Sequence, residues 1–150
     1  MSGVFGVVSK ENCSKDLLYG ADYHSHLGTE FGGVAILGDE FYRQIHSISQ
    51  SQFKSKFYED LMSVNGNKGI AVISDSNEQP MYLNSKFGPF CLVTSGLVEN
   101  SEEIARDLLE KGISFSEVSD GKINVTQLIA KLINTGETRS EEHTSELQSR

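Results

Sequence analysis

Ser2 is the residue of this sequence whose position alone suggests chemistry. The chain opens Met1-Ser2-Gly3-Val4-Phe5, so removal of Met1 would leave a serine hydroxyl beside its own α-amine. An α-amine, with a pKa of roughly 8, can serve as the base for a neighbouring nucleophile. The alternative is that Ser2 is only the small second residue that many proteins carry, since short motifs often occur without function. The rest of the sequence has to distinguish these two interpretations.

Two histidines, His24 and His26, are the next candidates, as metal ligands or as an acid–base pair. They stand two positions apart in a stretch that we expect to be helical, where such residues face different directions. No Cys, Asp or Glu accompanies them at a recognised ligand spacing. The glycine-rich stretch from Gly28 to Gly33 lacks the lysine and the following helix of a phosphate-binding loop. We therefore predict no metal site and no cofactor in this chain.

Composition narrows the class of protein. The 150 residues carry a net charge of -8 and are 37% hydrophobic, which fits one globular domain. The acidic balance argues against nucleic acid or a membrane surface as a partner, because both attract clustered Lys and Arg. No apolar run is long enough to span a bilayer, and no signal peptide is apparent. Cys13 and Cys91 form no metal-type pair and indicate reduced thiols, so we expect a cytoplasmic protein.

The hydrophobic pattern predicts an α+β fold. Strands are expected at 3–8, 31–37, 41–48, 69–74, 81–83, 90–98 (interrupted at 95–96) and 113–115, and helices at 13–26, 50–63, 101–111 and 124–132. Strands cluster rather than alternate with helices, which favours mostly antiparallel sheets. The density of Val and Phe over 3–8 suggests a strand buried on both faces. Asn100 and Glu103 form a capping-box pattern for the third helix.

Residues 139–150 do not continue this pattern. The string Arg139-Ser-Glu-Glu-His-Thr-Ser-Glu-Leu-Gln-Ser149 matches the translation of a widely used sequencing-library adapter. It follows the end of the hydrophobic periodicity near Ile133. We interpret it as an adapter-derived or disordered tail, with a natural acidic tail as the alternative. The predicted domain therefore covers residues 1–138.

Several short stretches, taken in order, resemble one family. They are Ser2-Gly3-Val4-Phe5-Gly6-Val7, His26-Leu27-Gly28-Thr29-Glu30-Phe31-Gly32-Gly33-Val34, Asn77-Glu78-Gln79-Pro80, Thr94-Ser95-Gly96 with Leu97-Val98-Glu99-Asn100, and Ser119-Asp120 before the final helix. Their order and spacing are similar to the class II glutamine amidotransferase domain, an N-terminal-nucleophile hydrolase. More narrowly, they resemble the N-terminal half of amidophosphoribosyltransferase, the first committed enzyme of purine synthesis. The resemblance covers roughly residues 1–138.

The resemblance implies a four-layer αββα fold with mostly antiparallel sheets. It assigns the nucleophile position to Ser2 and the oxyanion-hole positions to Ser95 and Gly96. It places Asp120 at the substrate's carboxylate and amine, with Gly28 close by. The family passes ammonia to a phosphoribosyltransferase domain, which binds phosphoribosyl pyrophosphate with Mg²⁺ and is expected beyond this chain as its partner. A homo-oligomer is a further possible assembly.

Four positions depart from the family pattern. The nucleophilic cysteine is replaced by Ser2, whose hydroxyl is a much poorer nucleophile than a thiol. The substrate-clamping arginine falls on Val72, and the arginine of a His-Arg-Gly motif falls on Leu27. The oxyanion-hole asparagine falls on Ser95, and losing one such donor costs about 10²–10³ in rate. We therefore predict that glutamine hydrolysis is lost, with a structural or regulatory domain, or a serine-type N-terminal amidohydrolase, as the alternatives.

Overall fold

A four-stranded antiparallel sheet forms the centre of the first half of the chain. The computed structural model describes residues 2–116, 118–119 and 121–136. The sheet has the order β1-β4-β2-β3, from β1 (Gly3–Val8), β4 (Lys68–Ser74), β2 (Phe31–Leu37) and β3 (Phe41–Ser47). In the register of β4, Val72 lies opposite Val4 on one side and Gly33 on the other.

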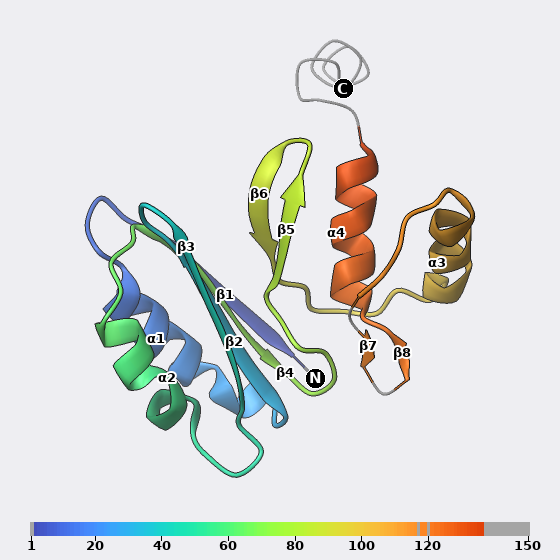
Figure 1. Cartoon of the computed structure of the whole chain (residues 1–150). Coiled ribbons are helices and arrows are strands. Elements are labelled where there is room, and N and C mark those ends of the chain that lie inside the picture. Colours follow the sequence, from blue (N-terminus) through green and yellow to red (C-terminus); the bar gives the residue numbers. More distant parts are fainter. Residues whose placement is uncertain (1, 117, 120, 137–150) are drawn as a thin grey trace, which may run out of the picture.

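Two helices cover one face of this sheet (Figure 1). They are α1 (Ser14–Tyr23) and α2 (Phe53–Met62), and the short 3-10 turn η1 (Ser25–Leu27) follows α1. The core between helices and sheet is apolar, because every third or fourth helical residue and alternate strand residues point inward. Its buried members are Leu17, Leu18, Ala21, Val34, Ile36, Ile48, Phe53, Phe57, Leu61, Ala71 and Ile73.

The second half of the chain adds the remaining layers. The hairpin β5 (Met81–Ser85) and β6 (Gly88–Leu92) stands between the first sheet and two helices, α3 (Ser101–Glu110) and α4 (Val125–Thr135) (Figure 1). A small ladder, β7 (Val118–Ser119) with β8 (Lys122–Ile123), lies between these helices in the chain. The layers therefore run helices, sheet, hairpin, helices, which confirms the predicted α+β class and the αββα order.

Several local predictions were wrong, and the first is that the strand at 3–8 is buried on both faces. Strand β1 is an edge strand, and its pattern alternates, with Val4 46% and Val8 78% exposed. Only one face of β1 is therefore covered, because Phe5 and Val7 pack toward the helices. The strand predicted at 90–98 ends at Leu92, and residues 113–115 form no strand.

Helix termini also differ from the prediction. Asn100 precedes α3 but makes no side-chain capping hydrogen bond. Among the described residues, the helix-capping side chain is that of Asn124, whose Oδ1 accepts hydrogen bonds from the backbone N–H groups of Thr126 and Gln127 at 2.9 and 3.3 Å. Within the described residues, none of the helices has the length and apolar character that a bilayer crossing requires.

Candidate functional site

Ser2 and Ser95, separated by 93 positions in the chain, meet in the structure. Ser2 lies just before β1, and Ser95 lies in the loop that follows β6. Their Oγ atoms are 2.9 Å apart, and Ser95 Oγ also donates to the backbone carbonyl of Ser2 at 3.1 Å. The predicted nucleophile and one predicted oxyanion-hole position are therefore direct neighbours.

The hydroxyl groups of Ser2 and Ser95 are engaged with one another. Either Oγ atom can be the donor of the 2.9 Å contact, and the Ser2 carbonyl oxygen is a second acceptor within reach of Ser95 Oγ at 3.1 Å. A serine hydroxyl has only one proton to donate. Both acceptors that the structure gives the Ser95 hydroxyl belong to Ser2, and neither is a substrate group.

Gly96 follows Ser95 and lines the same pocket as Ser2. Its φ of +137° lies in the region that side chains rarely adopt. A Cβ at this position would contact nothing within 4 Å, so glycine is required by the backbone conformation rather than by crowding. The assignment of Gly96 to the oxyanion hole stays a prediction.

Gly28 and Asp120 were the predicted substrate-binding positions. Gly28 is buried against the end of β4, where an added Cβ would lie 2.7 Å from Ile73 Cγ2 and 2.9 Å from the Ser74 nitrogen. This close packing explains a glycine there without a ligand, and Gly28 is absent from the pocket lining. Asp120 lies outside the described residues, although the neighbouring Gly121 lines the pocket.

Val72 occupies the position that the resemblance assigns to a clamping arginine. Its side chain is 1% exposed, and its neighbours across the strands are Val4 and Gly33. A buried valine between such neighbours can hold no carboxylate, because it has neither charge nor donor. Val72 thus takes part in apolar packing within the sheet.

Neither cysteine lies at the pocket beside Ser2. Cys13 is fully buried before α1, and Cys91 is half-buried in β6. Burial raises the pKa of the Cys91 thiol to about 11, against the lowering effect of Arg43. Burial also raises the pKa of Cys13. Both thiols therefore stay neutral at ordinary pH, and neither lines the pocket at Ser2.

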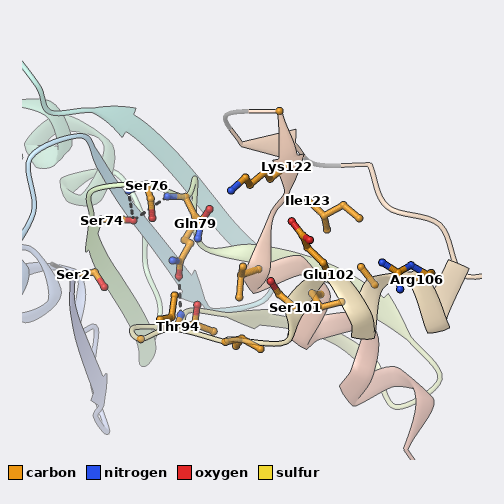
Figure 2. A pocket seen from close by; sticks show the side chains of 18 of the residues that line it. Ser2, Ser74, Ser76, Gln79, Thr94, Ser101, Glu102, Arg106, Lys122 and Ile123 are labelled. Atoms are coloured by element: carbon orange, nitrogen blue, oxygen red, sulfur yellow. Dashed lines mark hydrogen bonds between the residues drawn. The ribbon is translucent and has the colours of Figure 1, made fainter.

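A pocket of about 720 Å³ opens beside Ser2. Figure 2 shows Ser2, Ser74 and Thr94 on one side of it and Arg106 and Lys122 on the other. The first side is rich in hydroxyl groups from the strand ends and loops. The second side comes from α3, β8 and the start of α4. A volume of this size is typical of small-molecule sites.

Buried polar contacts hold the wall of this pocket in place. Gln79, which is 2% exposed, accepts a hydrogen bond from the Thr94 backbone N–H at 2.7 Å through Oε1. The hydroxyl groups of Thr94 and Thr126 are 2.7 Å apart. The Asn124 side chain donates to the Glu78 carbonyl at 3.1 Å. These contacts tie the loop before β5 and the loop after β6, just before Ser95, to α4.

Gly33 allows this loop to approach the first sheet. A Cβ on Gly33 would lie 1.6 Å from the Gln79 carbonyl oxygen, so only glycine lets the Gln79-Pro80 backbone rest on β2. The roles of Gln79, Thr94 and Thr126 were not predicted. Gln79-Pro80 belongs to a motif that carried the family resemblance, which was the available signal.

His24 and His26, the candidate metal ligands or acid–base pair, lie in different surroundings. Tyr23 and His24 make an edge-on ring contact, with centroids 5.2 Å apart, and His26 is exposed at η1. Among the residues that the structure describes, no three His, Cys, Asp or Glu side chains are grouped as a metal ion would need.

Known proteins with similar sequences identify the family to which this architecture is related. A family of glutamine amidotransferase domains matches residues 67–146. The chain is 28% identical to the amidophosphoribosyltransferase of Methanocaldococcus jannaschii, over 91% of this chain and 31% of that protein. It is 30% identical to a glutamine–fructose-6-phosphate aminotransferase of Fusobacterium nucleatum, over 88% of this chain and 23% of that protein. The chain thus spans a third or less of the length of these relatives.

Solved structures agree on the fold. The glutamine phosphoribosylpyrophosphate amidotransferase of B. subtilis matches with a TM-score of 0.76 at 23% identity, over 92% of this chain and 30% of that one. A structure described as the allosteric regulatory enzyme of purine biosynthesis matches with a TM-score of 0.77 at 21% identity, over the same shares. The fold is that of class II, N-terminal-nucleophile amidotransferase domains. By the match of residues 67–146, the chain belongs to the glutamine amidotransferase domain family.

Proposed function

We propose that this chain is the glutaminase-like domain of an amidophosphoribosyltransferase-type enzyme and that it no longer hydrolyses glutamine. The relation to amidophosphoribosyltransferase supports the first part. The proposal assigns transfer to phosphoribosyl pyrophosphate, with its Mg²⁺, to a further domain, and the coverage of only 31% of that relative supports this assignment. Because a glutamine–fructose-6-phosphate aminotransferase is also a relative, the rival assignment is an enzyme of the same family that uses a different sugar as its acceptor.

The Ser2–Ser95 pair is the observation that carries the second part. The family chemistry needs a strong nucleophile and a donor directed at the developing oxyanion. Here the nucleophile position holds a hydroxyl, and both acceptors within reach of the Ser95 hydroxyl, the Oγ and the carbonyl oxygen of Ser2, belong to that same residue. Val72 adds the third loss, because it removes the charge that would hold the substrate's carboxylate. A domain without these groups acts as a structural or regulatory unit of the larger enzyme.

One observation favours a second candidate, a serine-type N-terminal amidohydrolase. Ser2 borders the pocket of about 720 Å³ together with Ser74, Ser76 and Thr94. A terminal serine that reaches a pocket can attack an amide if its own amine is free to accept the proton. This candidate requires removal of Met1, which intact mass measures directly.

A glutaminase assay on the 150-residue chain tests the proposal. We expect no glutamate above the level of a buffer blank when L-glutamine is supplied, measured by mass spectrometry. The matched variants are Ser2→Ala at the nucleophile position and Ser51→Ala, an exposed serine outside the pocket. Glutamate production that Ser2→Ala abolishes and Ser51→Ala preserves would overturn the loss of activity.

Restoring the family residues gives the reciprocal test. A triple variant, Ser2→Cys with Ser95→Asn and Val72→Arg, returns the thiol, the amide donor and the clamp. We expect glutamate formation from the triple variant or from Ser2→Cys with Ser95→Asn, since each missing donor costs about 10²–10³ in rate. The double variant guards against misfolding, because it leaves the buried Val72 unchanged. Folded but inactive revertants would show that the site has lost more than these three groups.

A further inference from the structure

Ser74 brings a hydrogen-bond donor without an acceptor to the pocket beside Ser2. The residue is 2% exposed and lines the pocket. Its Oγ accepts hydrogen bonds from the backbone N–H groups of Ser76 and Asn77, both at 3.2 Å. These two bonds occupy the lone pairs of the oxygen, so the hydroxyl proton is left to donate. Within the described part of the chain, that proton has no acceptor.

Gln79 brings a second donor to the same pocket. The residue is 2% exposed. Its Oε1 accepts the Thr94 backbone N–H at 2.7 Å, which orients the amide and leaves both protons of Nε2 without an acceptor among the described residues. No fully buried side-chain nitrogen or oxygen of those residues lacks a partner. The small exposed part of Gln79 therefore includes Nε2, at the pocket that the residue lines.

A series of contacts holds these two donors on one wall beside Ser2. Ser74 Oγ anchors the backbone turn that leads to Gln79. Gln79 Oε1 in turn anchors Thr94, and the next residue, Ser95, contacts Ser2 at 2.9 Å. Figure 2 shows Ser74, Gln79 and Thr94 on the wall of the pocket nearest Ser2, with dashed lines for the contacts of Ser74 and Gln79.

We propose that this wall binds the carbonyl oxygen of an uncharged carboxamide that carries an apolar body. Donors taken out of water without an acceptor cost free energy, and an acceptor in the pocket removes that cost. A carbonyl oxygen has two lone pairs, so it can accept from Ser74 Oγ–H and from Gln79 Nε2–H together. Among uncharged carbonyl groups, the amide has the most electron-rich oxygen.

The surroundings of the two donors favour an uncharged ligand. The other described residues on this wall are uncharged, namely Ser2, Ser76, Asn77 and Thr94. Lys122 also lines the pocket, but it is exposed on β8, and in the described part of the structure no contact joins it to Ser74 or Gln79. A carboxylate at these donors would lose its water without gaining an ion pair, a cost that an amide oxygen avoids.

Apolar side chains next to this wall provide the surface for the body of the ligand. Leu97 and Val98 line the pocket and lie in the loop that carries Thr94. Leu128 also lines it, on α4, the helix that Thr126 links to Thr94 through hydroxyl groups 2.7 Å apart. Leu97 is 86% exposed. A large apolar group in contact with water at a pocket gains free energy when an apolar ligand covers it.

This ligand class differs from glutamine. Glutamine has the amide but also a carboxylate and an ammonium on one carbon, for which the wall at Ser74 and Gln79 offers no ion pair. The inference concerns the pocket of the proposed function, but it does not depend on hydrolysis. An amide can bind at Ser74 and Gln79 whether or not Ser2 attacks it.

Benzamide is the probe, titrated into the 150-residue chain and followed by calorimetry and by NMR of backbone and side-chain amides. We expect one site with a Kd of about 1 mM, as for a ligand of nine heavy atoms. The Gln79 Nε2–H resonances should shift, because they gain an acceptor. Benzoate and benzylammonium keep the ring, but benzoate adds an unpaired charge and benzylammonium lacks the acceptor. Each is expected to bind at least tenfold more weakly.

Variants test each donor. Gln79→Glu keeps an acceptor for the Thr94 N–H but replaces the donor by a carboxylate, so it should weaken benzamide binding at least tenfold. Gln52→Glu makes the same change at an exposed position outside the pocket and should alter the Kd less than twofold. Ser74→Ala should weaken binding about fivefold, the usual effect of one lost hydrogen bond. Ser51→Ala, exposed and outside the pocket, is its control.

The backbone spectrum of each free variant verifies its fold, and Ser74→Ala tests the donors on its own if Gln79→Glu does not fold. Four results would overturn the proposal: no saturable binding of benzamide, equal binding of benzoate, unshifted Gln79 side-chain resonances, or a Kd that the folded donor variants leave unchanged. Glutamate formation from glutamine is a separate measurement. Failure of benzamide to bind therefore leaves the loss of hydrolysis standing, and glutaminase activity would leave the binding site standing.

Discussion

The two halves of the molecule differ in what stabilises each of them: apolar packing in the first half and buried polar contacts in the second. The sheet half, residues 3–74, has a core of eleven buried apolar residues around α1, α2 and the four-stranded sheet. In the pocket half, residues 75–136, the described residues include three buried members of an apolar cluster, Ala105, Leu108 and Leu128. Four of the six buried polar residues that the structure describes nevertheless belong to this half, namely Gln79, Asn124, Thr126 and Gln127.

This difference affects both the stability of each half and the positioning of the pocket residues. Apolar packing has no direction, whereas a buried hydrogen bond fixes two groups in one geometry and costs free energy if it is broken. The pocket half thus positions Ser95 and α4 through a few directed contacts. It also leaves apolar side chains exposed around the pocket. We infer that the sheet half sets the global stability and that the pocket half opens locally at lower free energy.

Phe57→Ala gives the largest expected effect on the comparison. Phe57 is fully buried on α2 and stacks on Phe53, with ring centroids 4.4 Å apart. Removing the ring should lower the free energy of unfolding by about 3–5 kcal/mol, through lost transfer energy and a cavity. Urea denaturation measures this. Tyr58→Ala, on the same helix and 47% exposed, is the control and should cost far less. Equal losses would contradict a core centred on the sheet half.

Asn124→Ala tests the polar framework of the pocket half. Asn124 caps α4 through two backbone N–H groups and donates to the Glu78 carbonyl. Its loss should lower stability by about 2 kcal/mol, since a cap is worth about 1 kcal/mol and a buried hydrogen bond about as much. Hydrogen exchange should quicken first in α4. Asn100→Ala, which removes no capping bond, is the control and should change stability by under about 0.5 kcal/mol.

These two asparagines show what the sequence could and could not predict. Asn100 precedes a predicted helix, and Asn124 is the first residue of another; the capping-box pattern selected Asn100, although Asn124 is the residue that caps. A capping side chain competes with other partners, and only the packing of α4 against the Glu78 loop orients Asn124 correctly. By contrast, β2, β4 and α2 were predicted well because their apolar periodicity is local and dense.

For the candidate site, too, the sequence predicted some features and not others. The contact of Ser2 with Ser95 was accessible only through the family resemblance, because nothing local relates positions 93 residues apart. The cations Arg106 and Lys122 were not predicted to share a pocket. One stands on a surface helix and the other in a polar turn, where charged residues are ordinary. Their common placement depends on how α3 and β8 pack, which periodicity does not determine.

The smallest expected effect concerns the contact between Thr94, in the loop after β6, and Thr126 on α4. Thr126→Val keeps the shape of the side chain but removes the hydroxyl that lies 2.7 Å from Thr94 Oγ1. It should lower stability by about 1 kcal/mol, the usual net value of one buried hydrogen bond. Thr94→Val should do the same. The double variant should lose less than the sum, because the second substitution removes the partner that the first left unsatisfied.

Urea denaturation of the four proteins in this cycle gives the coupling energy, and hydrogen exchange shows where it acts. We expect a coupling of about 0.5–1 kcal/mol, with faster exchange confined to α4 and the loop at Ser95. Additive losses would mean that the two hydroxyl groups act independently, so that α4 does not position Ser95 through Thr94. Faster exchange spread through α1 and α2 would instead show that the two halves unfold as one unit.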